Sequence, residues 1–110
     1  MRRSDIKSSS GNVFADLALD APDELQAKAM LMSKVASLIA ERKMTQTQAA
    51  KTLGIDQPRV SALMRGKLSM FSTEKVMEFL TALGNDVEIV VKKRSKSRGP
   101  GRIHVVTAPA

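Results

Sequence analysis

The sequence contains no cysteine, no tryptophan and no tyrosine, and its one histidine is His104. Without cysteine, a disulfide framework, a thiol nucleophile and a thiolate metal site are all excluded. A single histidine leaves little material for a zinc centre or a histidine base, so we expect no catalytic residue, no metal and no other cofactor. No apolar run approaches the roughly 20 residues of a membrane span, and no apolar signal core follows the basic N-terminus. We therefore expect a cytoplasmic protein with no membrane partner.

The apolar residues that are present set the fold class. The 110 residues suffice for one domain and not for two. Hydrophobic residues make up 43% of the chain, yet only three are Phe, so Leu, Ile, Val, Ala and Met must fill the core. Such side chains favour thin, helix-on-helix packing over a sandwich or barrel, and we predict an all-α domain. The methionines expected to fill its core are Met30, Met32, Met44, Met64, Met70 and Met77.

The formal net charge of +7 is concentrated in two segments. Residues 42–70 have a net charge of +5 and residues 92–110 a net charge of +6, whereas residues 71–91 are acidic. A strongly basic protein is expected to bind a polyanion. The first basic segment has a foldable pattern. Residues 92–110 have none and are predicted to form a disordered tail, which either keeps the chain soluble or at most adds non-specific affinity for DNA.

The N-terminal part of the chain predicts an arm followed by a long helix. Residues 1–12 are polar and rich in serine, which indicates a flexible arm, and we place the folded domain at residues 13–91. Apolar residues recur at helical spacing over residues 25–43, with Asp20 as a plausible N-cap. These residues form two stripes, so this helix is expected to contact more than one neighbour.

Two short helices with clear start and stop signals follow. Thr45 and Gln48 form a capping box that opens the first of them, and Gly54 is placed to end it in the left-handed conformation. Asp56 can cap the second helix, which is predicted to stop near Gly66. A short turn joining two such helices indicates a helix-turn-helix unit.

The end of the domain predicts a fourth helix and a short strand. Ser72 is a suitable N-cap for the helix and Gly84 a suitable end. Residues 87–91 are too short for a further helix and rich in β-branched residues, so they predict a strand. We expect this strand to pair with that of a second copy, in a homodimer. The alternative is a hairpin with residues 103–106 of the same chain.

The helix-turn-helix candidate comprises residues 46–53 and 57–65. Ala50 is expected where the two helices cross, because a larger side chain would push them apart. The positions expected to be buried are Leu53, Ile55, Val60 and Leu63. Those expected to face outward are Gln57, Pro58, Arg59, Ser61, Ala62 and Arg65. The outward set suits a DNA major groove, since Arg can bind guanine, Gln can bind adenine and small apolar groups can contact a thymine methyl.

Residues 44–67 resemble the core of the Cro/cI-type (XRE) helix-turn-helix regulators, and the resemblance continues to residue 84. Residues 11–17, 56–61 and 85–91 are similar to HigA-type antitoxins of type II toxin–antitoxin modules. The whole resemblance covers about residues 11–92. It implies a four- to five-helix, lambda-repressor-like DNA-binding domain with a short C-terminal β-strand. It also implies a homodimeric repressor of a palindromic operator, normally that of its own operon.

The resemblance assigns a role to each DNA-binding residue. It implies that Gln46, helped by Thr45, binds phosphate and that the first exposed residues of the second motif helix read bases. Residues near the end of that helix are expected to clamp the backbone. The predicted DNA-binding residues are Thr45, Gln46, Gln57, Pro58, Arg59, Ser61, Arg65 and Lys67. Two simpler alternatives remain, in which Gln57 only caps its helix and Arg59 is a solvated surface charge.

The sequence thus predicts a transcriptional repressor that binds double-stranded DNA. The repressor is expected to dimerise through Val87, Ile89 and Val91. The antitoxin resemblance adds a toxin partner, a RelE/HigB-type ribonuclease, and toxin binding could be the main task. The alternative is a stand-alone or phage-like repressor without a toxin. An enzyme is not expected, because the carboxylates of residues 74–88 have the spacing of a solvated helix face. Recognition of RNA is disfavoured because unpaired bases stack on aromatic side chains, which are scarce here.

Overall fold

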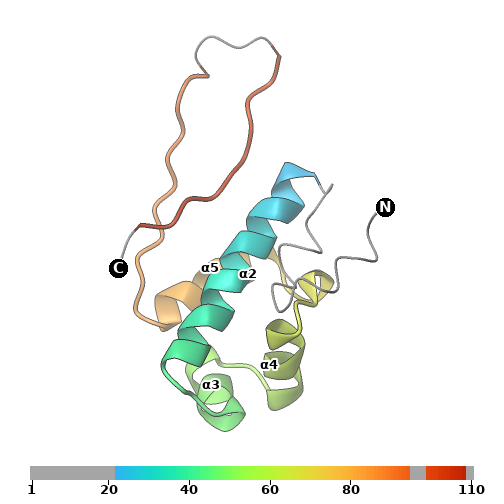
Figure 1. Cartoon of the computed structure of the whole chain (residues 1–110), viewed down its shortest axis with the longest axis vertical. Helices are drawn as coiled ribbons and strands as arrows, with labels where there is room; N and C mark the ends of the chain where they lie inside the picture. The colour runs from blue at the N-terminus through green and yellow to red at the C-terminus, as the bar shows by residue number, and fades with distance from the viewer. Residues whose placement is uncertain (1–21, 95–98, 109–110) are drawn as a thin grey trace.

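The computed structural model describes residues 22–94 and 99–108, and within them the fold is all-helical (Figure 1). The elements, in chain order, are α2 (Asp23–Glu41), α3 (Gln46–Leu53), α4 (Gln57–Met64), the 3-10 turn η2 (Leu68–Met70) and α5 (Thr73–Ala82). The all-α prediction is confirmed for this part of the chain, whose four α-helices fall within the predicted four to five. The predicted arm at residues 1–12 lies outside the described residues.

Helix α2 begins and ends two residues before the predicted bounds. Pro22 occupies its N-cap position, without a side-chain cap bond, and Asp20, the predicted cap, lies outside the described residues. At the other end Lys43 adopts a φ of 52°, in the left-handed region. This conformation turns the chain, and the amide of Met44 donates to the carbonyl of Ile39 at 3.1 Å. The helix therefore ends before Lys43 rather than at it.

The short helices have the caps that the sequence predicts. The hydroxyl of Thr45 accepts from the amide of Gln48, and the Gln48 side chain accepts from the amide of Thr45, which completes the capping box. Gly54 ends α3 with a φ of 73°. Asp56 Oδ1 accepts from the amide of Arg59 at 2.9 Å and caps α4. Ser72 Oγ caps α5 in the same way. Local sequence thus determines where each helix of the motif begins.

One hydrophobic core joins all four helices. Helix α2 lies across α5 and also contacts α4, whereas α3 packs on α4 and α5 near the C-terminal end of α2 (Figure 1). Met32, Val35, Leu63, Val76 and Phe79 are among the largest fully buried side chains. The rings of Phe71 and Phe79 meet edge to face, with centroids 5.7 Å apart and planes at 76°. Pairs of this geometry add to the free energy gained from burial alone.

The prediction that the methionines fill the core is only partly right. Met32 is fully buried, and Met44 and Met64 pack half-buried against the core. Met30 and Met70, however, are 48% and 49% exposed. Met30 lies on the solvent side of α2 and Met70 ends η2, so neither position faces the helices that form the core.

The predicted strand at residues 87–91 is absent from the described chain. Residues 85–94 leave α5 without regular secondary structure, and residues 99–108 return toward the helices (Figure 1). Val87 packs on the core, whereas Ile89 and Val91 are 75% and 92% exposed. Since no backbone hydrogen bond joins residues 87–91 to residues 103–106, the intrachain hairpin is wrong as well. A strand forms only when a neighbouring strand pairs with its backbone amides and carbonyls and covers its side chains. Residues 87–91 have no such neighbour in the described chain, so their β-branched residues do not form a strand.

The C-terminal segment contacts the start of α2 instead. The amide of Ile103 donates to Asp23 Oδ2 at 3.2 Å, and Arg102 Nε lies 3.7 Å from the same oxygen. Arg102 is largely exposed, so this ion pair is expected to contribute little to stability. Within the described ranges, none of the helices is long and apolar enough to cross a bilayer.

Candidate nucleic-acid interface

Helices α3 and α4 form the helix-turn-helix unit, joined by Gly54, Ile55 and Asp56. Ala49 of α3 is fully buried, whereas Ala50, which we expected at the helix crossing, is only half-buried. Both side chains pack on the core, and the expected place of Ala50 at the helix crossing stays a prediction. Gly54 supplies the left-handed turn conformation that residues with a Cβ adopt at a cost of about 1–2 kcal/mol.

The N-terminus of α3 presents Thr45 and Gln46 to solvent. The Thr45 hydroxyl accepts from the Gln48 amide, at 3.0 Å, and its O–H can still donate to a phosphate oxygen. Gln46 is exposed at the first helical position, where backbone amides lack helical partners. Both residues are placed as the phosphate-binding role requires, and that role remains a prediction.

Four of the predicted residues share one face of α4, on which Gln57, Pro58 and Arg65 are exposed and Ser61 is half-buried. At about 100° per residue, Gln57, Pro58, Ser61 and Arg65 fall within an arc of about 100°. Arg65 donates a hydrogen bond to the Ser61 hydroxyl, which places these two side chains together. The exposed arc therefore offers an amide, a hydroxyl and a guanidinium on one helix.

Gln57 does not cap its own helix, because Asp56 does so. The Gln57 amide nitrogen instead donates to the hydroxyl of Thr47 in α3, at 3.1 Å. This bond joins the N-terminal ends of the two motif helices and restrains the Gln57 side chain. Thr47 was not predicted, since a contact across ten residues leaves no signal in local spacing.

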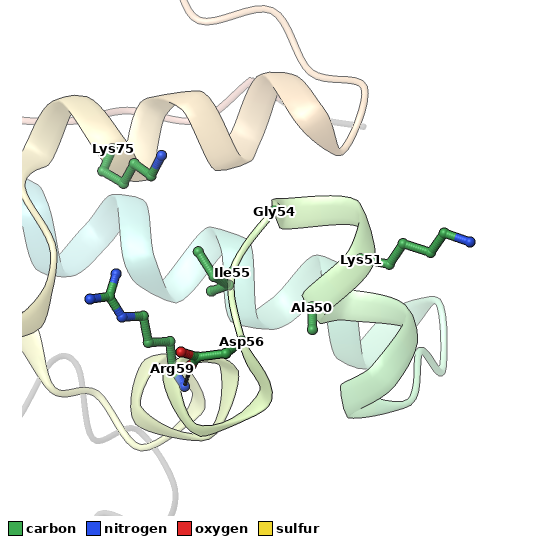
Figure 2. A pocket seen from close by; sticks show the side chains of 7 residues that line it. All are labelled: Ala50, Lys51, Gly54, Ile55, Asp56, Arg59 and Lys75. Atoms are coloured by element: carbon green, nitrogen blue, oxygen red, sulfur yellow. Dashed lines mark hydrogen bonds between the residues drawn. The ribbon is translucent and has the colours of Figure 1, made fainter.

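Arg59 lies apart from this face. It falls about 100° beyond Pro58 on α4, outside the exposed arc. Figure 2 shows its side chain extending toward α5 and Lys75 rather than along the exposed arc of α4. The structure thus brings Gln57, Ser61 and Arg65 together and leaves Arg59 on another side of the helix. Lys75 of α5 and Arg59 both line a concavity beside the motif turn, and Lys75 was not predicted as a site residue either.

The prediction that Ala62 faces outward is wrong. Ala62 is 5% exposed and belongs to the hydrophobic core cluster. The chain reverses after α4 at Gly66, and the amide of Lys67 donates to the Ala62 carbonyl at 3.0 Å. The following turn η2 packs against α4, and this packing leaves a side chain as small as that of Ala62 little exposed surface. Lys67 itself is exposed, as its predicted phosphate contact requires.

The interface contains few groups suited to a metal. Within residues 22–94 and 99–108, no group of three or more His, Asp or Glu side chains is placed to hold a metal ion. The only acidic side chain at the motif turn is Asp56, and its carboxylate caps α4. The chemistry of this surface is that of hydrogen-bond donors and positive charge.

The fold and the exposed face of α4 define a helix-turn-helix domain. A helix-turn-helix domain family matches residues 13–92, most of the chain. A solved structure assigned to the XRE family of transcriptional regulators is 45% identical, with a TM-score of 0.74 over 78% of this chain and 97% of that one. A comparison with curated proteins finds no match. The chain belongs to the XRE family of helix-turn-helix transcriptional regulators.

Proposed function

We propose that this protein is a sequence-specific repressor that binds double-stranded operator DNA in the cytoplasm. The observation that carries the proposal is the exposed face of α4, where Gln57, Pro58, Ser61 and Arg65 lie together. In helix-turn-helix proteins the second motif helix enters the major groove with its N-terminal residues against the bases. Gln57 is the residue of this face that can make a bidentate contact with adenine.

The division between base and phosphate contacts follows from position. Gln57 and Ser61 are near the N-terminus and middle of α4, so we assign them to bases. Arg65 and Lys67 are exposed at and beyond the end of α4. A basic side chain in that position is suited to binding the phosphates of the DNA backbone. Thr45 and Gln46 lie at the N-terminus of α3, whose free amides attract anions.

The proposal is tested by selecting binding sites from a random duplex library with the full chain. We expect one inverted repeat to be enriched. In Gln57→Ala, discrimination at one base of each half-site should fall by about 1–3 kcal/mol. Lys67→Gln is the matched control, since loss of a phosphate contact weakens all sequences alike. An unchanged base preference in Gln57→Ala would show that α4 does not read DNA through this residue.

A palindromic operator requires two copies of the chain. We propose that the copies associate through residues 87–91, with Val87, Ile89 and Val91 at the interface. The apolar side chains of Ile89 and Val91 are exposed, and residues 86–94 make no backbone hydrogen bond to another described residue. Pairing with the same segment of a second copy would satisfy that backbone and cover those side chains.

We further propose that the repressor is the antitoxin of a type II module and neutralises a RelE/HigB-type ribonuclease. The resemblance of residues 11–17, 56–61 and 85–91 to HigA-type antitoxins supports this role. The apolar residues 13–19, which could dock on a toxin, lie outside the described residues.

Co-expression with the product of the adjacent gene tests the antitoxin role. A toxin should co-purify with this chain in a fixed ratio. The toxin should inhibit growth when expressed alone, and co-expression of this chain should relieve that inhibition. An unrelated small basic protein is the control for charge-driven association, which salt removes. If the adjacent product neither binds nor inhibits growth, the chain is a stand-alone or phage-like repressor.

A further inference from the structure

A concavity lies where the turn of the motif faces α5. Its volume is about 660 Å³, and it is lined by Ala50, Lys51, Gly54, Ile55, Asp56, Arg59 and Lys75. These residues come from α3, the turn, α4 and α5, so the tertiary fold assembles them. The turn leads directly into Gln57, the residue we assign to base reading. The concavity therefore adjoins the proposed DNA-binding face.

The charges of this concavity are unbalanced. Lys51, Arg59 and Lys75 are basic, and Asp56 is the only acidic residue among the lining side chains. Asp56 Oδ1 accepts from the backbone amide of Arg59, and no ion pair joins it to a described cation. The net charge at the rim is thus positive, although none of these groups is deeply buried.

Arg59 and Lys75 extend into the same space from different helices, whereas Lys51 points away from both (Figure 2). The Arg59 guanidinium makes no ion pair with another described residue. The Lys75 ammonium forms an ion pair with the exposed carboxylate of Glu78, at 3.3 Å. Because both groups are exposed, water competes with this ion pair and weakens it. Two cations that face one space repel each other until an anion lies between them.

We infer that Arg59 and Lys75 together bind one phosphate of the DNA backbone, next to the bases read by α4. This inference rests on the proposed DNA-binding function and reassigns Arg59 from base reading to backbone binding. A guanidinium and an ammonium from two directions suit the several oxygens of a phosphate. The position of Arg59, outside the arc of Gln57 and Ser61, is what a contact beside the groove requires.

The salt dependence of binding tests the shared phosphate. Anisotropy of labelled duplexes, the selected operator and a random-sequence duplex, is measured with the full chain over a range of NaCl concentrations. Each phosphate contact contributes about 0.9 to the slope of log K against log[salt]. Arg59→Gln and Lys75→Gln should each lower the slope by up to about 0.9. The double variant should lose no more than about 0.9, because both changes remove the same contact.

Lys51→Gln is the matched control, since it lies at the same concavity and points away. Its effect on log K should add to that of Arg59→Gln, whereas the effects of Arg59→Gln and Lys75→Gln should not add. The double variant losing about 1.8 in slope, or a changed base preference in Arg59→Gln, would overturn the shared site. So would unchanged slopes with a wild-type protein that binds DNA. Failure of the wild type to bind either duplex would instead overturn the DNA-binding function, and this inference with it. Circular dichroism checks that each variant is folded.

Discussion

Phe79→Ala is expected to lower the free energy of unfolding by about 3–5 kcal/mol. Phe79 is 1% exposed in α5, and its ring meets that of Phe71 edge to face. Truncation removes this contact and leaves a cavity in the hydrophobic core that α5 shares with the other helices. Small domains have total stabilities of about 5–15 kcal/mol, so this single change removes a large part of the total.

Urea unfolding followed by far-ultraviolet circular dichroism measures this effect, since the chain has no Trp or Tyr for fluorescence. Phe79→Leu is the control, because it loses the ring pair but keeps a large apolar side chain in the core, so it should cost less than Phe79→Ala. Equal stability of wild type and Phe79→Ala would mean that α5 does not depend on this residue.

DNA binding should be lost in parallel with helicity on heating.

The double variant Ile89→Lys, Val91→Lys should be monomeric and should bind the inverted repeat about 10²–10⁴-fold more weakly than the wild type. The reason is that two linked reading helices bind as one unit, whereas a monomer binds each half-site separately. With two lysines on each chain, four like charges would meet at the proposed interface between the two copies. The same change would remove the apolar side chains of Ile89 and Val91 from that interface. Sedimentation measures the oligomeric state, and titration of full and half operators measures the affinities.

Val90→Lys is the matched control, because successive residues of a paired strand point to opposite faces. Val90 is 74% exposed, close to the 75% of Ile89, so the two positions differ mainly in that predicted direction. The control should stay dimeric. A wild-type chain that is monomeric when bound to the full operator, or a double variant that remains dimeric, would contradict pairing through this segment.

The sequence predicted the local structure of the motif because its signals are local. Thr45 with Gln48, Gly54, Asp56 and Ser72 each act within one turn of helix, and each has the predicted geometry. Capping depends on a side chain and an amide two or three residues away, so no knowledge of the fold is needed.

The errors concern residues whose surroundings are set by distant parts of the chain. Ala62 has the position of an outward residue on α4, but the reversal at Gly66 packs η2 against the helix. Residues 87–91 have strand propensity, but propensity forms no strand without a partner. The base-reading role of Arg59 stays a prediction, and the direction of its side chain toward α5 could not be predicted because it depends on how α5 packs beside the motif.

In the candidate site too, the sequence predicted what depends on local spacing and missed what depends on packing. Gln57, Ser61 and Arg65 could be grouped on one face, since helical spacing alone brings them together. Thr47 and Lys75 could not be found, because Thr47 meets Gln57 across the turn and Lys75 reaches the motif from α5. Both contacts require the packing of the whole domain.

Helix α4 has only eight residues, and a helix of this length is unstable in water on its own. The face of α4 proposed to read DNA therefore exists only while the core holds the helix, so operator binding, if proposed correctly, is coupled to folding. An operator present at about 100 times its dissociation constant adds about 2.7 kcal/mol to the stability of the bound chain. Cellular proteases degrade opened molecules, so under the proposed function we expect free copies to be cleared faster than those on DNA. The lifetime of the chain would then depend on how much of its operator is occupied.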